Sequence, residues 1–232
     1  MSQLFYAADL PQNTLLPEEE SHHLHKVLRL EAGKEILATD GKGMFYTLQL
    51  MGMQGRQMRT QVLHAVADAH PPSGIHLAVA PTKQMDRFEW MVEKCVEMGA
   101  ERITPLICMR SERRKIRIDR LERIALSAMK QSLHSRLPVI DEAVDFSRFI
   151  QLPQLPKARW MAHCEEDQKA MFSPQGSQSS VLLIGPEGDF HAEEIQSAKD
   201  KGFQMVSLGN YRLRTETAAL YGCALMSSGK RL

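Results

Sequence analysis

Strand and helix patterns alternate from Ile75 to the end of the chain, and this alternation restricts the fold more than any other feature. Short apolar runs predict buried strands at 75–81, 102–108, 158–164, 180–185 and 205–209. Amphipathic or capped segments predict helices at 86–98, 119–134, 191–201 and from about 215. Such alternation is typical of a mostly parallel sheet covered by helices on both faces, an α/β fold.

The residues before this region have a different pattern. Pro17 and the three acids after it predict a helix that runs to about Leu30. Strands are expected at 34–40, 43–51 and 56–67, with a tight turn at 40–43. Short strands with one helix indicate a small barrel. The paired prolines Pro71 and Pro72 mark a boundary, so we expect one domain over 1–70 and a second over 71–232.

Composition excludes several classes of protein. The chain of 232 residues is 43% hydrophobic, without a membrane-length apolar run or a secretory signal, so we expect a cytoplasmic protein. Its four cysteines are scattered, which argues against a zinc site and a disulfide framework. His22, His23 and His25 would point in diverging directions on a helix, so we expect no metal there either.

Three predicted strands end in residues with unusual chemistry. Glu165 and Glu166 follow one strand, the GPEG turn of 185–188 follows the next, and Gly209–Thr217 follows the last. Ligands of parallel α/β sheets bind beyond these carboxyl ends. The chain has neither a P-loop nor a dinucleotide fingerprint, which disfavours an ATPase, an NAD enzyme and the common methyltransferase fold. The GPEG pattern alone is equally compatible with a structural turn.

Arginines give a second chemical signal. Arg212 and Arg214 lie beside a predicted helix N-terminus, which already favours anions, so they indicate phosphate or base contacts. The alternative is a capping loop in which Thr215 or Thr217 is the cap. Between residues 110 and 136, nine Lys or Arg stand against three acids. This tract is either a phosphate-binding surface or a solvated helix face.

Four segments, in this order, resemble one known family. They are HHLHKVLRLEAGKEILATDG, KQMDRFEWMVEKCVEMGAERITPL, KQSLHSRLP, and LLIGPEGDF with LGNYRLRTETAAL. Together they resemble the RsmE family, 16S ribosomal RNA uracil-N3 methyltransferases of the SPOUT superfamily. The chain departs from the family pattern at Gln3, Lys130, Leu133–His134, Asp189 and around His191. Asp189 stands where the family usually has glycine.

The resemblance implies a SPOUT-type parallel sheet with a C-terminal trefoil knot and an N-terminal PUA-like β-barrel that helps to hold RNA. It also implies a homodimer with the active site near the subunit interface. S-adenosyl-L-methionine (SAM) is expected in a bent shape within the knot. The residues expected to hold it are His163, Leu183, Ile184, Gly185, Pro186, Glu187, Gly188, Leu208, Gly209, Asn210 and Leu213.

The implied reaction is methylation of N3 of a uridine in the decoding region of 16S ribosomal RNA, and the expected substrate is this RNA within an assembled small subunit. Arg214, or alternatively Arg212, would stabilise charge on the uracil oxygens. Glu187, Glu216 or Asp189 would serve as general base. The residues expected to contact RNA are His22, Lys26, Arg29, Lys83, Arg110, Arg113, Arg114, Arg136 and Arg212. His22, Lys26 and Arg29 would share one helix face.

Two rival functions remain open at this point. One is a SPOUT methyltransferase that acts on tRNA or on another ribosomal nucleotide. The other is an RNA-binding module without catalysis, which would keep the basic tract and the barrel but would leave the three strand ends unexplained.

Overall fold

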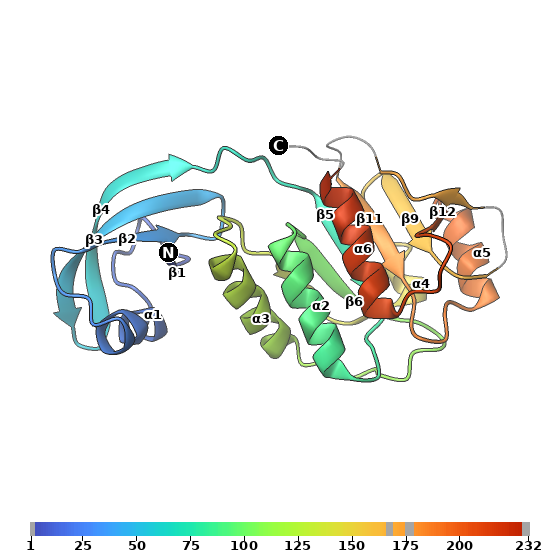
Figure 1. Cartoon of the computed structure of the whole chain (residues 1–232), viewed down its shortest axis with the longest axis horizontal. Helices are drawn as coiled ribbons and strands as arrows, with labels where there is room; N and C mark the ends of the chain where they lie inside the picture. The colour runs from blue at the N-terminus through green and yellow to red at the C-terminus, as the bar shows by residue number, and fades with distance from the viewer. Residues whose placement is uncertain (1–2, 166–168, 175–178, 229–232) are drawn as a thin grey trace. The chain divides into compact units, whose positions relative to one another are not determined.

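A parallel sheet forms the centre of the larger of two compact units (Figure 1). The computed structural model describes residues 3–165, 169–174 and 179–228. The first unit comprises Met1–Pro71 and Met129–Leu137, and the second comprises Pro72–Ala128 and Pro138–Leu232. Among the described residues, no helix combines the length and apolar character needed to cross a lipid bilayer.

The sheet of the second unit has the strand order β10-β12-β9-β11-β5-β6-β7, and β8 also pairs with β6. All pairings among these described strands are parallel. The strands are β5 (Ile75–Val79), β6 (Arg102–Ile107), β7 (Val139–Ile140), β8 (Val144–Asp145), β9 (Ala158–Ala162), β10 (Ala170–Met171), β11 (Ser180–Ile184) and β12 (Gln204–Ser207). Every residue of β5 and β11 is buried, as continuous apolar central strands require.

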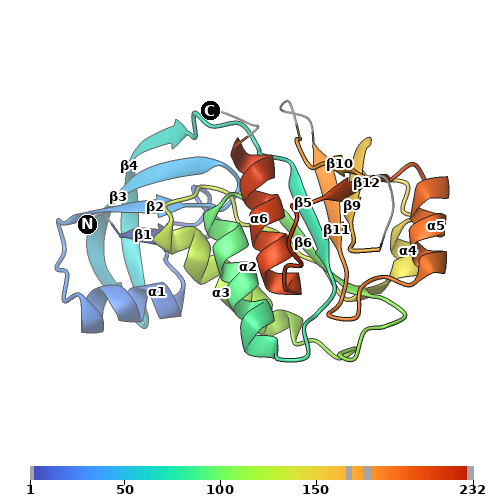
Figure 2. The same ribbon diagram turned by 45° about the vertical axis from the view of Figure 1, so that its right-hand side comes forward.

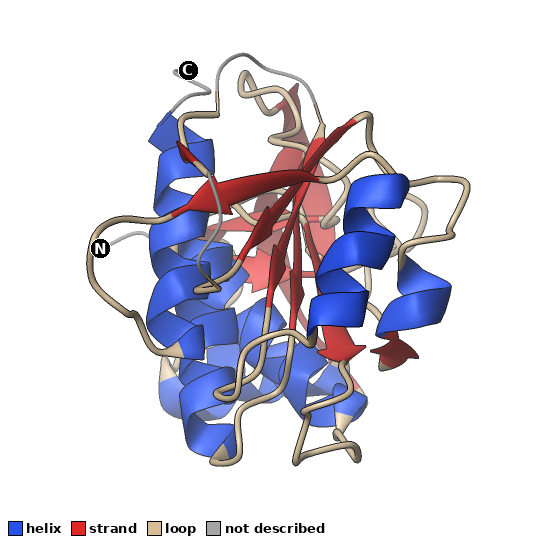
Figure 3. Cartoon of the chain, turned by 90° about the vertical axis from the view of Figure 1, so that its right-hand side faces the viewer, coloured by secondary structure: helices blue, strands red, loops and turns tan. Residues whose placement is uncertain are grey.

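Helices cover both faces of this sheet (Figures 2 and 3). On one face, α2 (Met85–Glu97) packs beside α6 (Thr215–Ser228), which also contacts β5 and β11. On the other face, α4 (Phe146–Phe149) and α5 (Ala192–Asp200) cover a core that includes Phe149, Val181 and Phe190. The helix α3 (Ile118–Gln131) follows β6. The predicted parallel α/β architecture is confirmed.

The first unit contains a second sheet, with strand order β1-β2-β3-β4. Its strands are β1 (Leu4–Tyr6), β2 (Glu35–Thr39), β3 (Met44–Gln54) and β4 (Gln57–Ala67). Leu15 adds a bridge to Arg59 of β4. The helix α1 (Glu18–His22) follows Pro17, as predicted, and continues as the π-helix η1 (His23–Val27).

The segment Met129–Leu137 joins the first unit through hydrogen bonds to the β2–β3 turn and to the end of β4. The carbonyl oxygen of Ser135 accepts hydrogen bonds from Thr39 Oγ1, at 2.9 Å, and from the amide of Gly43, at 3.1 Å. The Ser135 hydroxyl donates to Asp68. The unit therefore includes residues that are remote in the sequence from its strands.

Several local predictions need correction. The first helix ends at Val27 instead of Leu30, and its second half has π geometry. The predicted helix at 119–134 ends at Gln131, because Leu133 adopts a left-handed backbone with φ of 57°. Strands β1, β7, β8 and β10 and helix α4 were not predicted. Each has only two to four residues, too few for a periodic pattern.

A polar cluster lies at the amino end of β5 and β6. His76 Nε2 lies 2.7 Å from Thr104 Oγ1, and Arg102 binds Asp141 through two hydrogen bonds of 2.8 and 2.9 Å. Burial, with the nearby Arg102 charge, lowers the pKa of His76 from 6.5 to about 4. Burial opposes ionisation of Asp141, but hydrogen bonds from Arg102 and Thr104 hold its pKa below the usual value.

This cluster predicts a pH dependence of stability. Between pH 6.5 and about 4 the unfolded chain protonates His76 while the folded chain does not, so the free energy of unfolding falls as the pH falls. Urea titrations at pH 7 and pH 5, followed by tryptophan fluorescence, should show this loss, since both tryptophans lie in the second unit. His76→Gln should reduce the loss by roughly 1–3 kcal/mol. The exposed His64→Gln variant should keep it, and an unchanged loss in His76→Gln would contradict the assignment.

Candidate active site

A pocket of about 630 Å³ lies at the carboxyl ends of β9, β11 and β12. Parallel strands end at one edge of a sheet, so the loops after these three strands meet there. The volume lies in the range typical of small-molecule and cofactor sites. The pocket is lined by Ala162, His163, Cys164, Lys169, Ile184, Gly185, Pro186, Glu187, Asp189, Ser207, Leu208, Gly209, Asn210, Tyr211, Arg212, Leu213, Arg214, Thr215 and Ala218.

The GPEG turn after β11 is held by tight packing. A Cβ atom on Gly185 would lie 2.9 Å from the ring of Phe190, so only glycine fits without a shift of this buried side chain. The amide of Asp189 donates to the carbonyl of Pro186 at 2.9 Å and closes the turn. Asp189 itself has a left-handed backbone with φ of 62°.

The Asp189 carboxylate joins the GPEG turn to the end of β9. Its Oδ2 accepts a hydrogen bond of 2.7 Å from the amide of Cys164, and its Oδ1 accepts one of 2.8 Å from the amide of Phe190. Both carboxylate oxygens therefore accept hydrogen bonds from backbone amides. The hydrogen bond to Cys164 fixes the loop after β11 to the loop after β9.

The third loop is fastened to the GPEG turn as well. Thr215, buried in the first turn of α6, donates from Oγ1 to the carbonyl of Gly185 at 3.0 Å. Arg212 donates to the carbonyl of Glu187 at 3.2 Å. Gly209, with φ of 138°, has a backbone conformation that side chains other than glycine rarely adopt. The pocket is thus preformed by backbone and side-chain hydrogen bonds.

The structure brings most of the predicted cofactor residues together in this pocket. Leu183 and Gly188 are the exceptions: Leu183 is wholly buried in the core, and the Gly188 carbonyl instead accepts a 2.8 Å hydrogen bond from Arg110. Sequence reasoning missed several lining residues that flank the motifs. Among these, Lys169 donates to the carbonyl of His163 at 2.8 Å. It lies outside the motifs in which the sequence predicted chemistry, so no pattern identified it. Glu166 lies outside the described residues.

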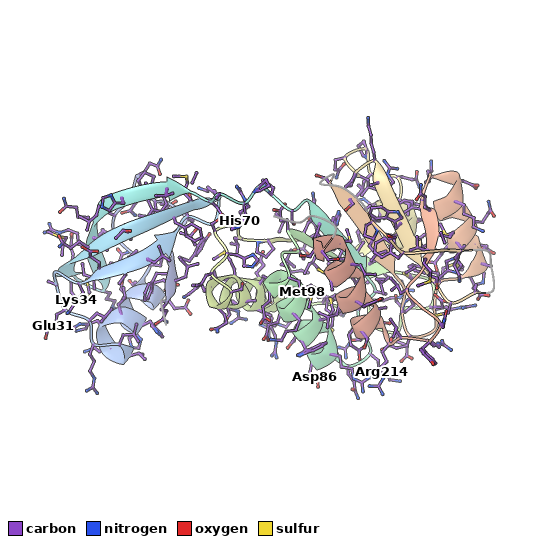
Figure 4. All side chains as sticks on the ribbon, turned by 45° about the horizontal axis from the view of Figure 1, so that its top comes forward. Glu31, Lys34, His70, Asp86, Met98 and Arg214 are labelled. Atoms are coloured by element: carbon purple, nitrogen blue, oxygen red, sulfur yellow. The ribbon has the colours of Figure 1, made fainter. Side chains whose placement is uncertain are left out.

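The three catalytic candidates have different surroundings. Glu187 lines the pocket, and its Oε1 accepts a 2.9 Å hydrogen bond from the amide of Lys83. Arg214 is exposed and lines both this pocket and a smaller hollow beside it. Glu216 lies in that smaller hollow instead, buried and 4.0 Å from the guanidinium of Arg87. Figure 4 shows Arg214 and Asp86 at the same end of α6 and α2.

The RNA-contact candidates of the second unit gather in part around the GPEG turn. Lys83 pairs with Glu112 at 2.9 Å, and the Lys83 carbonyl accepts a 3.0 Å hydrogen bond from Arg113. Arg110 and Arg212 both donate to carbonyls of the turn. Arg114 lies elsewhere, in a hollow that also contains Glu193, Glu194 and Asp145. These acids partly balance the positive charge there.

The candidates of the first unit do not share one helix face as predicted. His22 ends α1, Lys26 lies in the π-helix, and Arg29 follows it with a left-handed backbone, φ 53°. The wider π turn shifts the spacing on which the prediction depended. Lys26 and Arg29 still line one shallow hollow, without His22. Arg136 donates at 3.1 Å to the carbonyl of Lys42, and its guanidinium packs over Gly43.

No metal-binding arrangement was found within the described ranges 3–165, 169–174 and 179–228.

Comparisons with known proteins agree on one family. Residues 69–227 match the model of an RNA methyltransferase domain, and residues 16–58 match an RNA methyltransferase PUA domain. A ribosomal RNA small subunit methyltransferase E from Synechocystis is 30% identical, over 92% of this chain and 72% of that protein.

Solved structures agree with this assignment. A probable rRNA methyltransferase from Porphyromonas gingivalis is 40% identical, with a TM-score of 0.91 and 98% of each chain covered. A ribosomal RNA small subunit methyltransferase E from Neisseria gonorrhoeae, solved with S-adenosyl methionine bound, is 28% identical, with a TM-score of 0.85 and 98% of each chain covered. The N-terminal PUA-like domain and the methyltransferase sheet are thereby confirmed, and the chain belongs to the RsmE family of small-subunit ribosomal RNA methyltransferases.

Proposed function

We propose that this protein uses SAM to methylate N3 of one uridine in the decoding region of 16S ribosomal RNA. The supporting observation is the preformed pocket, in which the loops after β9, β11 and β12 are hydrogen-bonded to one another. A module that only binds RNA has no need of such a pocket. We further propose that the substrate is an assembled small subunit and that the protein acts in the cytoplasm.

The residues of the pocket fit SAM. Apolar side chains suited to an adenine ring line it, namely Ala162, Ile184, Leu208, Leu213 and Ala218. Loop amides and carbonyls at Gly185–Glu187 and Leu208–Asn210 can bind the polar edges of such a ligand. Glu187 supplies negative charge for a positively charged group, and Lys169 supplies positive charge for a carboxylate. When bound, SAM offers a methyl group on a sulfonium ion.

The residues of this chain would prepare the acceptor. Uracil N3 carries a proton, and its departure leaves negative charge on the ring oxygens. The exposed guanidinium of Arg214 is the group that we propose to stabilise this charge, as an oxyanion hole does. Arg212 is less suited, because it already donates to the carbonyl of Glu187. Alignment of the two reactants would supply much of the remaining rate acceleration.

Among the carboxylates considered, Glu187 is the general base that we propose. Asp189 uses both oxygens to accept backbone hydrogen bonds. Glu216 lies outside the pocket, beside Arg87. Glu187 lines the pocket and is anchored through Oε1 by the Lys83 amide, which leaves it oriented within the site.

Three further features implied by the family are proposals here. The first is a division into a PUA-like domain at 1–70 and a SPOUT domain at 71–232. The second is the trefoil knot, supported by the path of the chain: β12 pairs with β9, whereas the helix after it packs on α2 and β5. The third is a homodimer with its interface near the active site, which rests on the family resemblance.

RNA is proposed to contact the basic side chains around the GPEG turn, with Lys26 and Arg29 of the first unit contributing separately. An RNA contact has less support for three other candidates. His22 lies outside the hollow that Lys26 and Arg29 line, and Arg114 lies near Glu193 and Glu194. Arg136 donates a hydrogen bond to the carbonyl of Lys42 in the β2–β3 turn. Contacts with phosphates make binding weaken as salt rises.

The proposed reaction predicts where methyl groups are transferred. Small subunits that lack the modification, incubated with the protein and methyl-labelled SAM, should gain label at N3 of one decoding-region uridine. Mapping of the methylated base by mass spectrometry of nuclease fragments checks this. Label on tRNA, or on another ribosomal nucleotide, would support the rival methyltransferase function, and no SAM binding at all would leave only an RNA-binding role.

The proposed role of Arg214 predicts a separation of binding and turnover. Arg214→Ala should lower the rate constant for methyl transfer by about 10²–10³-fold, since it removes a stabiliser of developing charge. SAM affinity, measured by calorimetry, should stay near that of the unchanged protein. Arg56→Ala, at an exposed position outside the pocket, serves as the control. Near-normal turnover of Arg214→Ala would remove this residue from the catalytic role.

A further inference from the structure

The proposed general base is oriented by a segment outside its own loop. Glu187 belongs to the GPEG turn after β11, but the 2.9 Å hydrogen bond to its Oε1 comes from the amide of Lys83. Lys83 lies between β5 and α2, 104 residues earlier in the chain. The direction of the Glu187 carboxylate therefore depends on the position of the Lys83 backbone.

The Lys83 backbone is in turn held by the loop after β6. Arg113 Nη2 donates a 3.0 Å hydrogen bond to the Lys83 carbonyl, so this residue is bound through its amide on one side and its carbonyl on the other. Glu112 adds an ion pair of 2.9 Å with the Lys83 ammonium. That ammonium ends a flexible four-carbon chain and the pair is exposed, so it holds the backbone less directly than Arg113 does.

The loop that carries Arg113 is well anchored. The buried Ser111 hydroxyl accepts a 2.9 Å hydrogen bond from the amide of Cys108, and the Ser111 amide donates to the Cys108 carbonyl at 3.1 Å. The amide of Met109 donates at 2.9 Å to the buried carboxylate of Glu194. The Arg113 side chain therefore extends from an ordered loop and can fix what it binds.

The same loop also grips the backbone of the GPEG turn. Arg110 Nη1 donates to the carbonyl of Gly188 at 2.8 Å and to the carbonyl of Phe190 at 3.3 Å. The loop after β6 thus holds the turn directly through Arg110, and it holds the carboxylate of the turn through Lys83.

We propose that Arg113 is a positioning residue for the methylation reaction, because through Lys83 it holds the Glu187 carboxylate in the direction that receives the N3 proton. The inference rests on the function proposed above, in which Glu187 is the general base. In this role Arg113 touches neither reactant. A general base must lie within hydrogen-bond reach of the proton that it removes, so a misdirected carboxylate lowers the rate although it is still present.

An RNA contact by the same side chain would act at a different step. Arg113 is exposed, and a guanidinium has five N–H donors, of which the bond to Lys83 uses one. A phosphate contact strengthens the binding of small subunits and weakens as salt rises. Positioning of Glu187 instead changes the rate of methyl transfer after the subunits are bound. Measurement with saturating subunits therefore isolates the positioning role.

The first test measures the rate constant for methyl transfer with saturating small subunits and SAM. Arg113→Ala should lower this rate constant by about 10–100-fold, since misplacement of a catalytic group carries a cost of this size. SAM affinity, measured by calorimetry, should not change. Arg113→Lys keeps a donor for the Lys83 carbonyl and should recover part of the loss. Arg148→Ala, at an exposed arginine of α4, is the matched control and should behave as the unchanged protein.

A double-mutant cycle tests the route through the base. Glu187→Gln should lower the rate constant by about 10²–10⁴-fold, because it removes the group that takes the proton. Once the base is absent, Arg113→Ala should lower the rate constant by less than about twofold, so the two effects should not add. Long incubations with methyl-labelled SAM keep the double variant measurable.

The outcomes separate this inference from the proposed function. An unchanged rate constant of Arg113→Ala at saturation, even with weaker subunit binding, would overturn the positioning role and leave only an RNA contact. Additive effects of the two substitutions would overturn it as well, since Arg113 would then act on another group. Loss of SAM binding in Arg113→Ala would also count against it, because it would indicate a general structural role. An unchanged protein that does not methylate N3 would instead overturn the proposed function, and full activity of Glu187→Gln would overturn its general base.

Discussion

The parallel pairing of β9, β11 and β12 is the constraint on which the active site depends. Because the three strands run in one direction, the loops after them leave the sheet at the same edge. Hydrogen bonds then fix each loop to the GPEG turn, through Asp189 to Cys164, Arg212 to Glu187 and Thr215 to Gly185. The pocket consequently has its shape before a ligand enters, which reduces the ordering cost of binding.

Asp189 contributes to this arrangement through both its backbone and its side chain. A left-handed backbone, with φ of 62° at Asp189, costs a residue other than glycine on the order of 1 kcal/mol. In this protein the side chain compensates, because its carboxylate accepts two backbone hydrogen bonds, each contributing about 1.5–3 kcal/mol. The Asp189 side chain therefore offsets the backbone cost and directly links two loops of the pocket.

The two arginines after β12 have distinct positions although they are separated by one residue. Arg212 donates to the Glu187 carbonyl and so helps to build the pocket. Arg214 lies at the junction of the pocket and the smaller hollow, where α2 and α6 meet. Arg212 thus contributes to loop geometry, and Arg214 is the guanidinium to which the proposed mechanism assigns the reactants.

The sequence by itself determined the five main strands, the helices between them and the two glycine-bearing loops, since periodicity and turn residues are local signals. It missed β1, β7, β8 and β10, which form only by pairing with distant strands. Tertiary structure alone decided which loop residues face the pocket. It also decided the π geometry that separates His22 from Arg29. The placement of Asp86 and Trp90 beside Arg214 was likewise decided only by tertiary structure. The packing of α2 against α6 joins these residues across most of the second unit, and no local pattern encodes such a long-range contact.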